Sequence, residues 1–438
     1  MKKRFLSLVL GFLIGIAGAA GQSDENEALF YSTEIPVSLT EATQYALQHN
    51  HNLQNASMDV KVAEAQRWQT IAAMLPQADM QMVYQNMCGY EMNMKGFSIP
   101  MNPNGTMSVN ASIALNGQMV VGALLNNVAV DMQRINRDEK EVSLVVDVEN
   151  MYLTILAMEK TLAVLDSSKA NLSALYQMTA GAVEVGAAEQ TDADQLEVQV
   201  ASLESSIKST QRSIALLYNS LAYSMGVGSD VRIVLTDKLE DVLNVEAAIN
   251  LLHADFDITK NNTYKLAEKN LELAEKNVIM AGMAYIPTLS AYYQYSAKTY
   301  FGEDEGMNMT PPNVVGVTLS VPLWSSGKRA AGVHEKRIAK AQAENTLADS
   351  KDAIELAYRQ AKYNLINAYE NYDIQRKNID VTDRVMKSTS NKYQYGRVSA
   401  LDLTTANTNL LNANSNYIQA IVTLLNAQMA LKNLLDVK

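Results

Sequence analysis

The amino-acid sequence predicts a mainly α-helical fold with membrane β-strands, in which one structural unit occurs twice along the chain. Three observations support this prediction. Glycine (20) and proline (8) are scarce among the 438 residues, and helix-forming residues fill most of the rest. Several landmarks recur about 210 residues apart. In each half, an alternation of apolar and polar residues interrupts the helical periodicity, as expected for strands.

Residues 1–21 have the features of a secretory signal peptide. Lys2, Lys3 and Arg4 precede an apolar run over residues 5–16, and small residues follow it. We expect cleavage there and exclude this segment from the fold. A retained membrane anchor is the less favoured alternative, because the run is shorter than the ~20 residues of a spanning helix. No cysteine follows the cleavage region, so a lipid anchor is not expected.

The composition excludes several classes of protein. The formal net charge is −11, and removing the three cations of the leader takes it to −14, so nucleic acid is not an expected partner. Cys88 is the only cysteine, which rules out an intramolecular disulfide. No later segment reaches 18 consecutive apolar residues, so we expect no transmembrane helix. Membrane insertion would therefore require strands closed into a barrel.

Landmarks in the two halves keep a nearly constant offset. Pro287 follows Pro76 by 211 residues. Three further pairs are 210 residues apart: Gly117 and Gly327, Gly186 and Gly396, and Asp192 and Asp402. This period far exceeds that of solenoid repeats, so it indicates duplication of a whole unit. We expect a first repeat at 22–226, a linker or equatorial region at 227–243 with a short strand over 230–235, and a second repeat at 244–438.

Each repeat is expected to contain three helical segments around its strands. The expected helices are 38–74, 118–180 and 190–225 in the first repeat, and 244–284, 328–395 and 399–436 in the second. Ser38 and Glu41 form a capping box at the first of these, and both opening helices contain a polar break. The two longest segments have the alternating three- and four-residue spacing of a coiled coil. A helix of ~65 residues rises ~100 Å, so the molecule must be elongated.

The segments that follow Pro76 and Pro287 predict two strand pairs, with strands of about 9 to 11 residues. The apolar side chains that we assign to a lipid-facing surface are Met82, Tyr84, Ile113, Tyr293, Val317 and Leu319. Two ordinary hairpins packed on the helices are the alternative, but strand length, the separation of polar from apolar residues and Trp324 near a strand end favour the membrane. Four strands cannot close a barrel. Two chains would give eight strands with a plugged interior, whereas three would give twelve around a water-filled lumen, so we expect a homotrimer.

The ordered set of these features resembles the TolC-like outer-membrane efflux proteins. The resemblance runs from SLTEATQYALQHN through VTLSVPLWSSGKR to AQMALKNLL, and so covers essentially the whole mature chain. It implies a trimeric 12-stranded β-barrel in the outer membrane, continued by a long α-helical coiled-coil tunnel in the periplasm. It also implies a passive exit duct that docks on a periplasmic adaptor and an inner-membrane transporter. The cargo, whether drugs, metals or polypeptides, is left open.

The resemblance also implies a gate at the periplasmic tip of the tunnel. Gly186 and Gly396 would lie at the turns of two helical hairpins that contact the adaptor. Thr191 and Asp192 would accept hydrogen bonds from Tyr393 and Arg397, and Asp402 would form a ring of three carboxylates facing the pore. The arginine follows Gly396 directly, one position earlier than in better-known members of the family. The alternative is that these residues only cap helices and solvate a turn.

The remaining candidate sites are weak. Residues 80–107 contain seven methionines and Cys88, which are ligands for Cu(I), but strand and loop methionines need no ligand role, and we expect no metal site. His49 and His51 lack a nearby carboxylate. The sequence shows no phosphate-binding loop, zinc signature or nucleophile elbow, so we expect no cofactor and no enzyme. An exported structural coiled-coil protein that tethers or bridges the envelope remains the second functional hypothesis.

Overall fold

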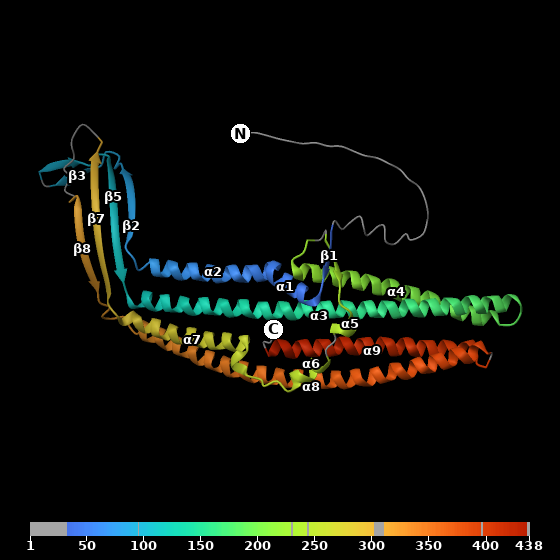
Figure 1. The fold of residues 1–438 in the computed structure, drawn as a ribbon. Coiled ribbons are helices and arrows are strands. Elements are labelled where there is room, and N and C mark those ends of the chain that lie inside the picture. The colour runs from blue at the N-terminus through green and yellow to red at the C-terminus, as the bar shows by residue number, and fades with distance from the viewer. Residues whose placement is uncertain are drawn as a thin grey trace, which may run out of the picture.

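The chain forms a long rod of helices with a β-sheet at one end (Figure 1). At the other end the chain reverses direction twice, in two turns between helices that we call the helical turns. The computed structural model describes residues 33–94, 96–228, 231–242, 245–301, 311–395 and 397–435. The expected signal peptide at 1–21 lies outside the described residues. The mainly helical class predicted from the sequence is confirmed.

The helices and strands have the following bounds. The α-helices are α1 (Leu39–His49), α2 (His51–Ala72), α3 (Gly117–Glu184), α4 (Gln190–Met225), α5 (Leu239–Val242), α6 (Val245–Leu252), α7 (Asn262–Gly282), α8 (Lys328–Gln394) and α9 (Ala400–Leu434). The strands are β1 (Thr33–Val37), β2 (Gln77–Gln85), β3 (Glu91–Met94), β4 (Phe97–Pro100), β5 (Asn104–Leu115), β6 (Val231–Leu235), β7 (Thr288–Tyr300) and β8 (Asn313–Ser320). Short 3₁₀ turns η1 (Ile258–Lys260) and η2 (Met283–Tyr285) flank α7.

The first expected helix is broken at Asn50, within the polar stretch that predicted a break. The Ser38 and Glu41 side chains form the predicted capping box of α1. Asn50 ends α1 and caps α2, because its Oδ1 accepts a hydrogen bond from the backbone N–H of Leu53 at 2.9 Å. Its Nδ2 donates to the carbonyl oxygen of Ser224 at 2.7 Å, which ties the break to the end of α4.

The second opening helix, expected over 244–284 with a polar break at 260–263, is interrupted over a longer stretch than predicted. Two helices, α6 and α7, occupy this region, and residues 253–261 between them are not α-helical. Asn261 begins α7 by accepting a hydrogen bond from the backbone N–H of Tyr264 at 3.2 Å, and its Nδ2 donates to the carbonyl oxygen of Leu434 at 3.1 Å. This asparagine therefore ties α7 to the end of α9, as Asn50 ties α2 to the end of α4.

The long helices run the length of the rod without a break. Helix α3 has 68 residues and α8 has 67, so each spans about 100 Å. Helix α4 returns along the distal half of α3, and α9 returns along the distal half of α8, while α2 and α7 cover the halves next to the sheet (Figure 1). Neither long helix contains proline, which would remove a hydrogen bond inside the helix.

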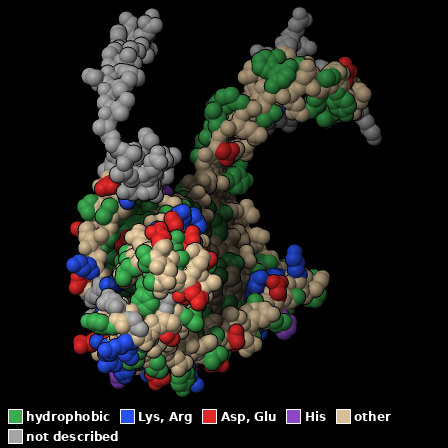
Figure 2. All heavy atoms as spheres, turned by 90° about the vertical axis from the view of Figure 1, so that its right-hand side faces the viewer, with side chains coloured by type: hydrophobic (Ala, Val, Ile, Leu, Met, Phe, Trp, Pro, Cys, Tyr) green, Lys and Arg blue, Asp and Glu red, His purple; other side chains and the backbone are tan. Residues whose placement is uncertain are grey.

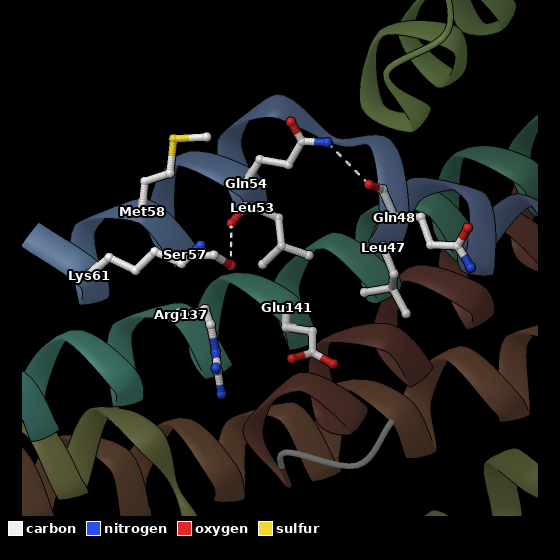
Figure 3. A pocket seen from close by; sticks show the side chains of 9 residues that line it. All are labelled: Leu47, Gln48, Leu53, Gln54, Ser57, Met58, Lys61, Arg137 and Glu141. Carbon is white, nitrogen blue, oxygen red and sulfur yellow. Dashed lines mark hydrogen bonds between the residues drawn. The ribbon is translucent and has the colours of Figure 1, made fainter.

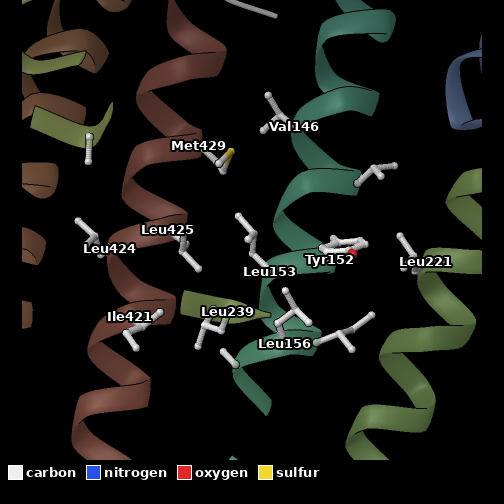
Figure 4. Packing of buried hydrophobic residues seen from close by; sticks show 14 of the residues in the cluster. Val146, Tyr152, Leu153, Leu156, Leu221, Leu239, Ile421, Leu424, Leu425 and Met429 are labelled. Atoms are coloured by element: carbon white, nitrogen blue, oxygen red, sulfur yellow. The ribbon is translucent and has the colours of Figure 1, made fainter. Parts of the chain in front are cut away.

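The main hydrophobic core lies in the middle of the rod, where α3 packs between α4 and α9 (Figure 4). Leu153 of α3 and Leu425 of α9 point toward each other. Tyr152 points the other way, toward Leu221 of α4, and is fully buried. Leu156, Ile421 and Leu424 belong to the same buried cluster. A smaller apolar cluster lies nearer the helical turns; it includes Leu172, Leu175, Leu196, Leu203 and Leu403. Burial of these residues joins the two helical hairpins along their length.

The four expected strands form one antiparallel sheet with the order β2, β5, β7, β8. The two predicted strand pairs are β2 with β5 and β7 with β8, and β5 joins β7 in the middle. The predicted linker strand is β6, which pairs in parallel with β1. The β3 and β4 hairpin was not predicted. No described helix combines the length and the apolarity needed to cross a membrane.

Candidate functional site

One face of the four-stranded sheet is apolar across all four strands. Residues paired across antiparallel strands point to the same face, so the register identifies its members. One row joins Ile113, Ala291 and Val317, and the next joins Leu115, Leu289 and Leu319. Further rows on this face are Ala78, Ala111, Tyr293 and Val315; Met80, Val109, Tyr295 and Asn313; and Met82, Met107 and Ala297.

The six residues assigned to a lipid-facing surface all lie on this apolar face. Met82, Tyr84, Tyr293, Val317 and Leu319 are exposed, and Ile113 is half-buried. Val317, near the middle of β8, leaves 71% of its surface exposed. A contiguous exposed apolar surface of this kind is costly in water and indicates contact with lipid or another protein.

The opposite face of the sheet is lined by small and polar residues. Asn110 Nδ2 donates a hydrogen bond to Asp79 Oδ2 at 3.2 Å across the β2 and β5 pair. Ser108 and Ser296 are paired and almost buried. Further along, the ring of Tyr292 lies against Gly316, where an added Cβ would approach the ring to 2.4 Å. The sheet therefore separates an apolar surface from a polar one.

Charged side chains gather on the helices rather than on the sheet (Figure 2). Viewed from the helical turns, blue and red atoms surround the end of the rod, whereas the sheet curving away behind it is mainly hydrophobic and uncharged. A membrane-inserted sheet and a solvated helical rod would show this distribution.

The first helical turn reverses the chain through Gly186. Helix α3 ends at Glu184, and Gly186 has a φ of +75°, the left-handed conformation that favours glycine. The backbone N–H of Ala187 donates to the carbonyl oxygen of Ala182 at 2.8 Å, which closes the end of the helix. In the next turn, Thr191 Oγ1 donates to Glu189 Oε2 at 3.3 Å.

Asp192 and Asp402, 210 residues apart, lie in the first turns of α4 and α9. The backbone N–H of Asp192 donates to the carbonyl oxygen of Glu189 at 3.1 Å. Asp402 accepts hydrogen bonds from the backbone N–H and the hydroxyl of Ser399, at 3.0 and 2.8 Å. These bonds lower the pKa of the Asp402 carboxyl below its usual value. Asp402 is therefore a helix-capping carboxylate within its own chain.

The second helical turn contains the other predicted gate residues. Gly396 lies outside the described residues. The backbone N–H of Arg397 donates to the carbonyl oxygen of Lys392 at 2.9 Å, and its side chain is exposed. The hydroxyl of Tyr393 lies 3.2 Å from Oγ1 of the buried Thr179 in α3. Among the described residues of one chain, Tyr393 thus pairs with Thr179, and its predicted bond to the turn before α4 stays a prediction.

Sequence reasoning missed Thr179, although a signal was present. This threonine lies on the apolar seam of α3, four residues after Leu175, and a buried hydroxyl needs a hydrogen-bond partner. The seam alone could not identify Tyr393, because that partner is 214 residues away in the chain. The pair joins the distal ends of α3 and α8, which belong to different hairpins.

The weak candidate sites have no catalytic arrangement. His49 stacks on Tyr45, and its Nδ1 lies 3.0 Å from the Tyr45 carbonyl oxygen. Within the described ranges, no group of three or more His, Cys, Asp or Glu residues could hold a metal. A hollow of about 570 Å³ lies where α1 and α2 meet α3, with Lys61, Arg137 and Glu141 among apolar and amide side chains (Figure 3). Among the residues that line this hollow, no nucleophile is paired with a base.

Comparison with known proteins agrees with this architecture. The model of the outer membrane efflux protein family matches residues 42–227 and 260–436. None of the curated proteins matches the chain.

Several solved structures have the same fold. The CmeC outer membrane channel of Campylobacter jejuni is 15% identical, with a TM-score of 0.75 over 91% of this chain and 85% of CmeC. CusC is 17% identical, with a TM-score of 0.74 over 93% of this chain and 94% of CusC. The outer membrane protein VceC of Vibrio cholerae is 17% identical, with a TM-score of 0.73 over 91% of this chain and 96% of VceC.

The family model covers most of the chain, and the order of helices and strands along the rod is shared with these channels at low sequence identity. The recognition made from the ordered sequence features is thereby confirmed. This protein belongs to the outer membrane efflux protein family.

Proposed function

We propose that the protein is the outer-membrane exit duct of a tripartite efflux or type I secretion system. The duct is a passive, gated channel, and a periplasmic adaptor opens it at the helical turns. The observation that supports this proposal most directly is the sheet, whose apolar face is exposed across four strands while its other face is polar. A membrane channel needs this division, because lipid surrounds it and water fills it.

The proposed assembly is a homotrimer. Strands β2 and β8 are the two edges of the sheet, and their backbone groups on the outer sides need partners. Pairing β8 of one chain with β2 of the next satisfies both edges. Three chains close a barrel of twelve strands, which is wide enough for a water-filled lumen, whereas two would close eight strands with a filled interior.

The helices form the second part of the proposed duct. At about 100 Å, α3 and α8 are more than three times as long as the ~30 Å core of a bilayer is thick, so most of their length must extend away from the membrane. We place them in the periplasm. The order of helix, two strands of the four-stranded sheet, long helix and returning helix occurs in residues 51–225, with the β3 and β4 hairpin inserted between the two strands, and again in 262–434, in keeping with a duplicated unit around a linker.

The gate is proposed at the two helical turns. In the closed trimer, Thr191 and Asp192 accept hydrogen bonds from Tyr393 and Arg397, and three copies of Asp402 face the pore. The turns at Gly186 and Gly396 contact the adaptor. The exposed side chain of Arg397 is free to reach a neighbouring chain, and charge-assisted bonds of this kind are strong enough to hold a closed state. Adaptor binding would break them.

The test is single-channel conductance in a planar bilayer. The native protein should show a small conductance, and Arg397→Ser should raise it severalfold, because one set of closing bonds is lost in each chain. Arg359→Ser is the matched control, since Arg359 is an exposed arginine in the middle of α8, the helix that precedes the turn containing Arg397, and it is paired with Glu355 at 3.7 Å. It should leave the conductance unchanged.

Each other outcome has a defined meaning. If the protein conducts and neither substitution changes the conductance, the channel is supported, but Arg397 is only a solvated turn residue and not part of a gate. A folded protein that remains soluble after osmotic shock and never conducts would favour the alternative, a structural coiled-coil protein. That alternative does not explain why the sheet has an exposed apolar face.

A further inference from the structure

A hollow lined by apolar and cationic side chains lies between the end of α7 and the start of α8. Figure 1 shows that these two ends meet next to the sheet. Its volume is about 480 Å³. The apolar walls come from Met280 and Ala281 at the end of α7, from Ala284 in η2, and from Pro322 and Trp324 in the segment between β8 and α8. Lys328, Arg329 and Lys336 of α8 line it as well. None of the twelve lining residues, all of them described, is acidic, although the chain as a whole carries a charge of −11.

The cationic side of this hollow is held in place. Arg329 Nη1 donates to the carbonyl oxygen of Pro322 at 2.8 Å, and its Nε donates to Ser325 Oγ at 3.0 Å. Its guanidinium also lies 5.1 Å from the centre of the Tyr285 ring. These contacts fix the segment between strand and helix against α7. They thereby position the first turn of α8, which carries the exposed Lys328.

The hollow continues the apolar face of the sheet. Val315, Val317 and Leu319 on that face lead along the chain to Val321 and Leu323, which are also exposed. Trp324 follows, with 86% of its surface exposed. An exposed tryptophan at the end of an apolar band is typical of the level where lipid headgroups begin. The hollow therefore lies at the boundary between hydrocarbon and water on the side of the sheet nearer the helices.

We propose that this hollow binds the headgroup of an anionic phospholipid in the leaflet nearer the helices. The proposal rests on the membrane placement of the sheet given above. Lys328 and Arg329 would donate charge-assisted hydrogen bonds to the phosphate, while Trp324 and the apolar walls contact the glycerol and the first acyl carbons. Lys336 adds a third positive charge, part of which Glu335 neutralises at 2.8 Å.

Tryptophan fluorescence provides a local test, because the chain has two tryptophans, Trp68 and Trp324. In a Trp68→Phe protein, Trp324 is the only indole, and bromine atoms on nearby acyl chains quench it. The protein is inserted into phosphatidylcholine vesicles that contain a small fraction of either brominated phosphatidylglycerol or brominated phosphatidylcholine. The proposal predicts several-fold stronger quenching by the anionic lipid at equal fraction.

Substitutions identify the charges responsible. Lys328→Gln should lower the preference for the anionic lipid about fivefold, which is the effect expected for one basic residue near an anionic headgroup. Lys351→Gln is the control, because this exposed lysine lies on the same helix about 35 Å further from the sheet. It should keep the preference. Arg329 is left unchanged, since it also holds the structure of the segment.

The outcomes separate this proposal from the proposed function. Failure of the protein to float with the vesicles would refute the membrane placement itself. Insertion with equal quenching by both brominated lipids would overturn the headgroup site and leave the duct intact. Relief of the quenching by millimolar glycerol phosphate in solution would show a general phosphate site rather than a membrane lipid site, and would also overturn the proposal.

Discussion

Val317→Arg tests the apolar face where its effect should be largest. Val317 is the fifth of the eight residues of β8, and it is paired with Ala291, which in turn is paired with Ile113. Its side chain is 71% exposed and its neighbours in the row are apolar. If this face contacts lipid, the arginine must either place its charge in hydrocarbon or extend its side chain along the sheet to reach water.

The expected loss of assembly free energy depends on how deep residue 317 lies in the bilayer and on how many chains carry the substitution. An arginine on the lipid face of a barrel costs ~2–4 kcal/mol at the bilayer midplane, and a trimer carries it three times, so assembly should lose about 6–12 kcal/mol. Even the lower figure exceeds four powers of ten in an equilibrium constant. Folded trimer should therefore be nearly absent from the membrane.

Thr318→Arg is the matched control. Thr318 is the next residue of β8, is paired with Ser290, and points to the polar face. An arginine there should lie in the water-filled lumen and leave assembly close to normal. The assay is the yield of heat-sensitive oligomer on electrophoresis of outer-membrane extracts, with urea-dependent folding into vesicles as the quantitative measurement. Equal yields from the two variants would refute the assignment of the apolar face to lipid.

Three further predictions concern side-chain contacts within one chain. Lys432→Met should cost about 3 kcal/mol in urea unfolding, because it leaves Glu149, now 2.7 Å away and 16% exposed, without its partner; adding Glu149→Leu should restore most of the loss. Gly316→Ala should lower trimer yield, since its Cβ would approach the ring of Tyr292 to 2.4 Å, and Tyr292→Ser in the same chain should rescue it. Burial, together with a hydrogen bond to a carboxylate, raises the pKa of Tyr152 from 10.0 to about 12, so the neutral phenol stabilises the fold fully below pH 10 and loses this contribution as the pH rises toward 12. Stability measured across that interval should fall less steeply for Tyr152→Phe, and an unchanged slope would contradict the assignment.

The sequence predicted those features that repeat along the chain. The absence of proline over 118–180 and 328–395 predicted two unbroken helices, because local periodicity and helix propensity determine long helices. Period-two alternation predicted both strand pairs and placed Met82 and Val317 on the same face, since the pleat alone fixes the face of each side chain. These predictions needed no knowledge of which segments meet in space.

The features that the sequence did not predict depend on contacts between distant segments. The polar stretch at 260–263 predicted the break at which α7 begins, but not that the side chain of Asn261 contacts the carbonyl group of Leu434 there. Thr179 pairs with Tyr393 on another hairpin. A local sequence pattern cannot identify such partners, because the two residues of each pair lie far apart in the chain. A local sequence pattern says even less about the predicted bonds of Arg397, because their partners belong to a second chain.

The parallel pairing of β1 with β6 has a consequence for the order of events during synthesis. Thr33 pairs with Val231, 198 residues later, and the backbone N–H of Leu39 donates to Asp237 Oδ2 at 2.8 Å. At ~5–20 residues per second, the ribosome needs about 10–40 s to produce the partner of β1 after β1 itself. A parallel strand cannot be replaced by a local hairpin, so the earliest described segment must wait, unpaired, for the middle of the chain. The first described strand can therefore pair only after the whole first repeat has been made.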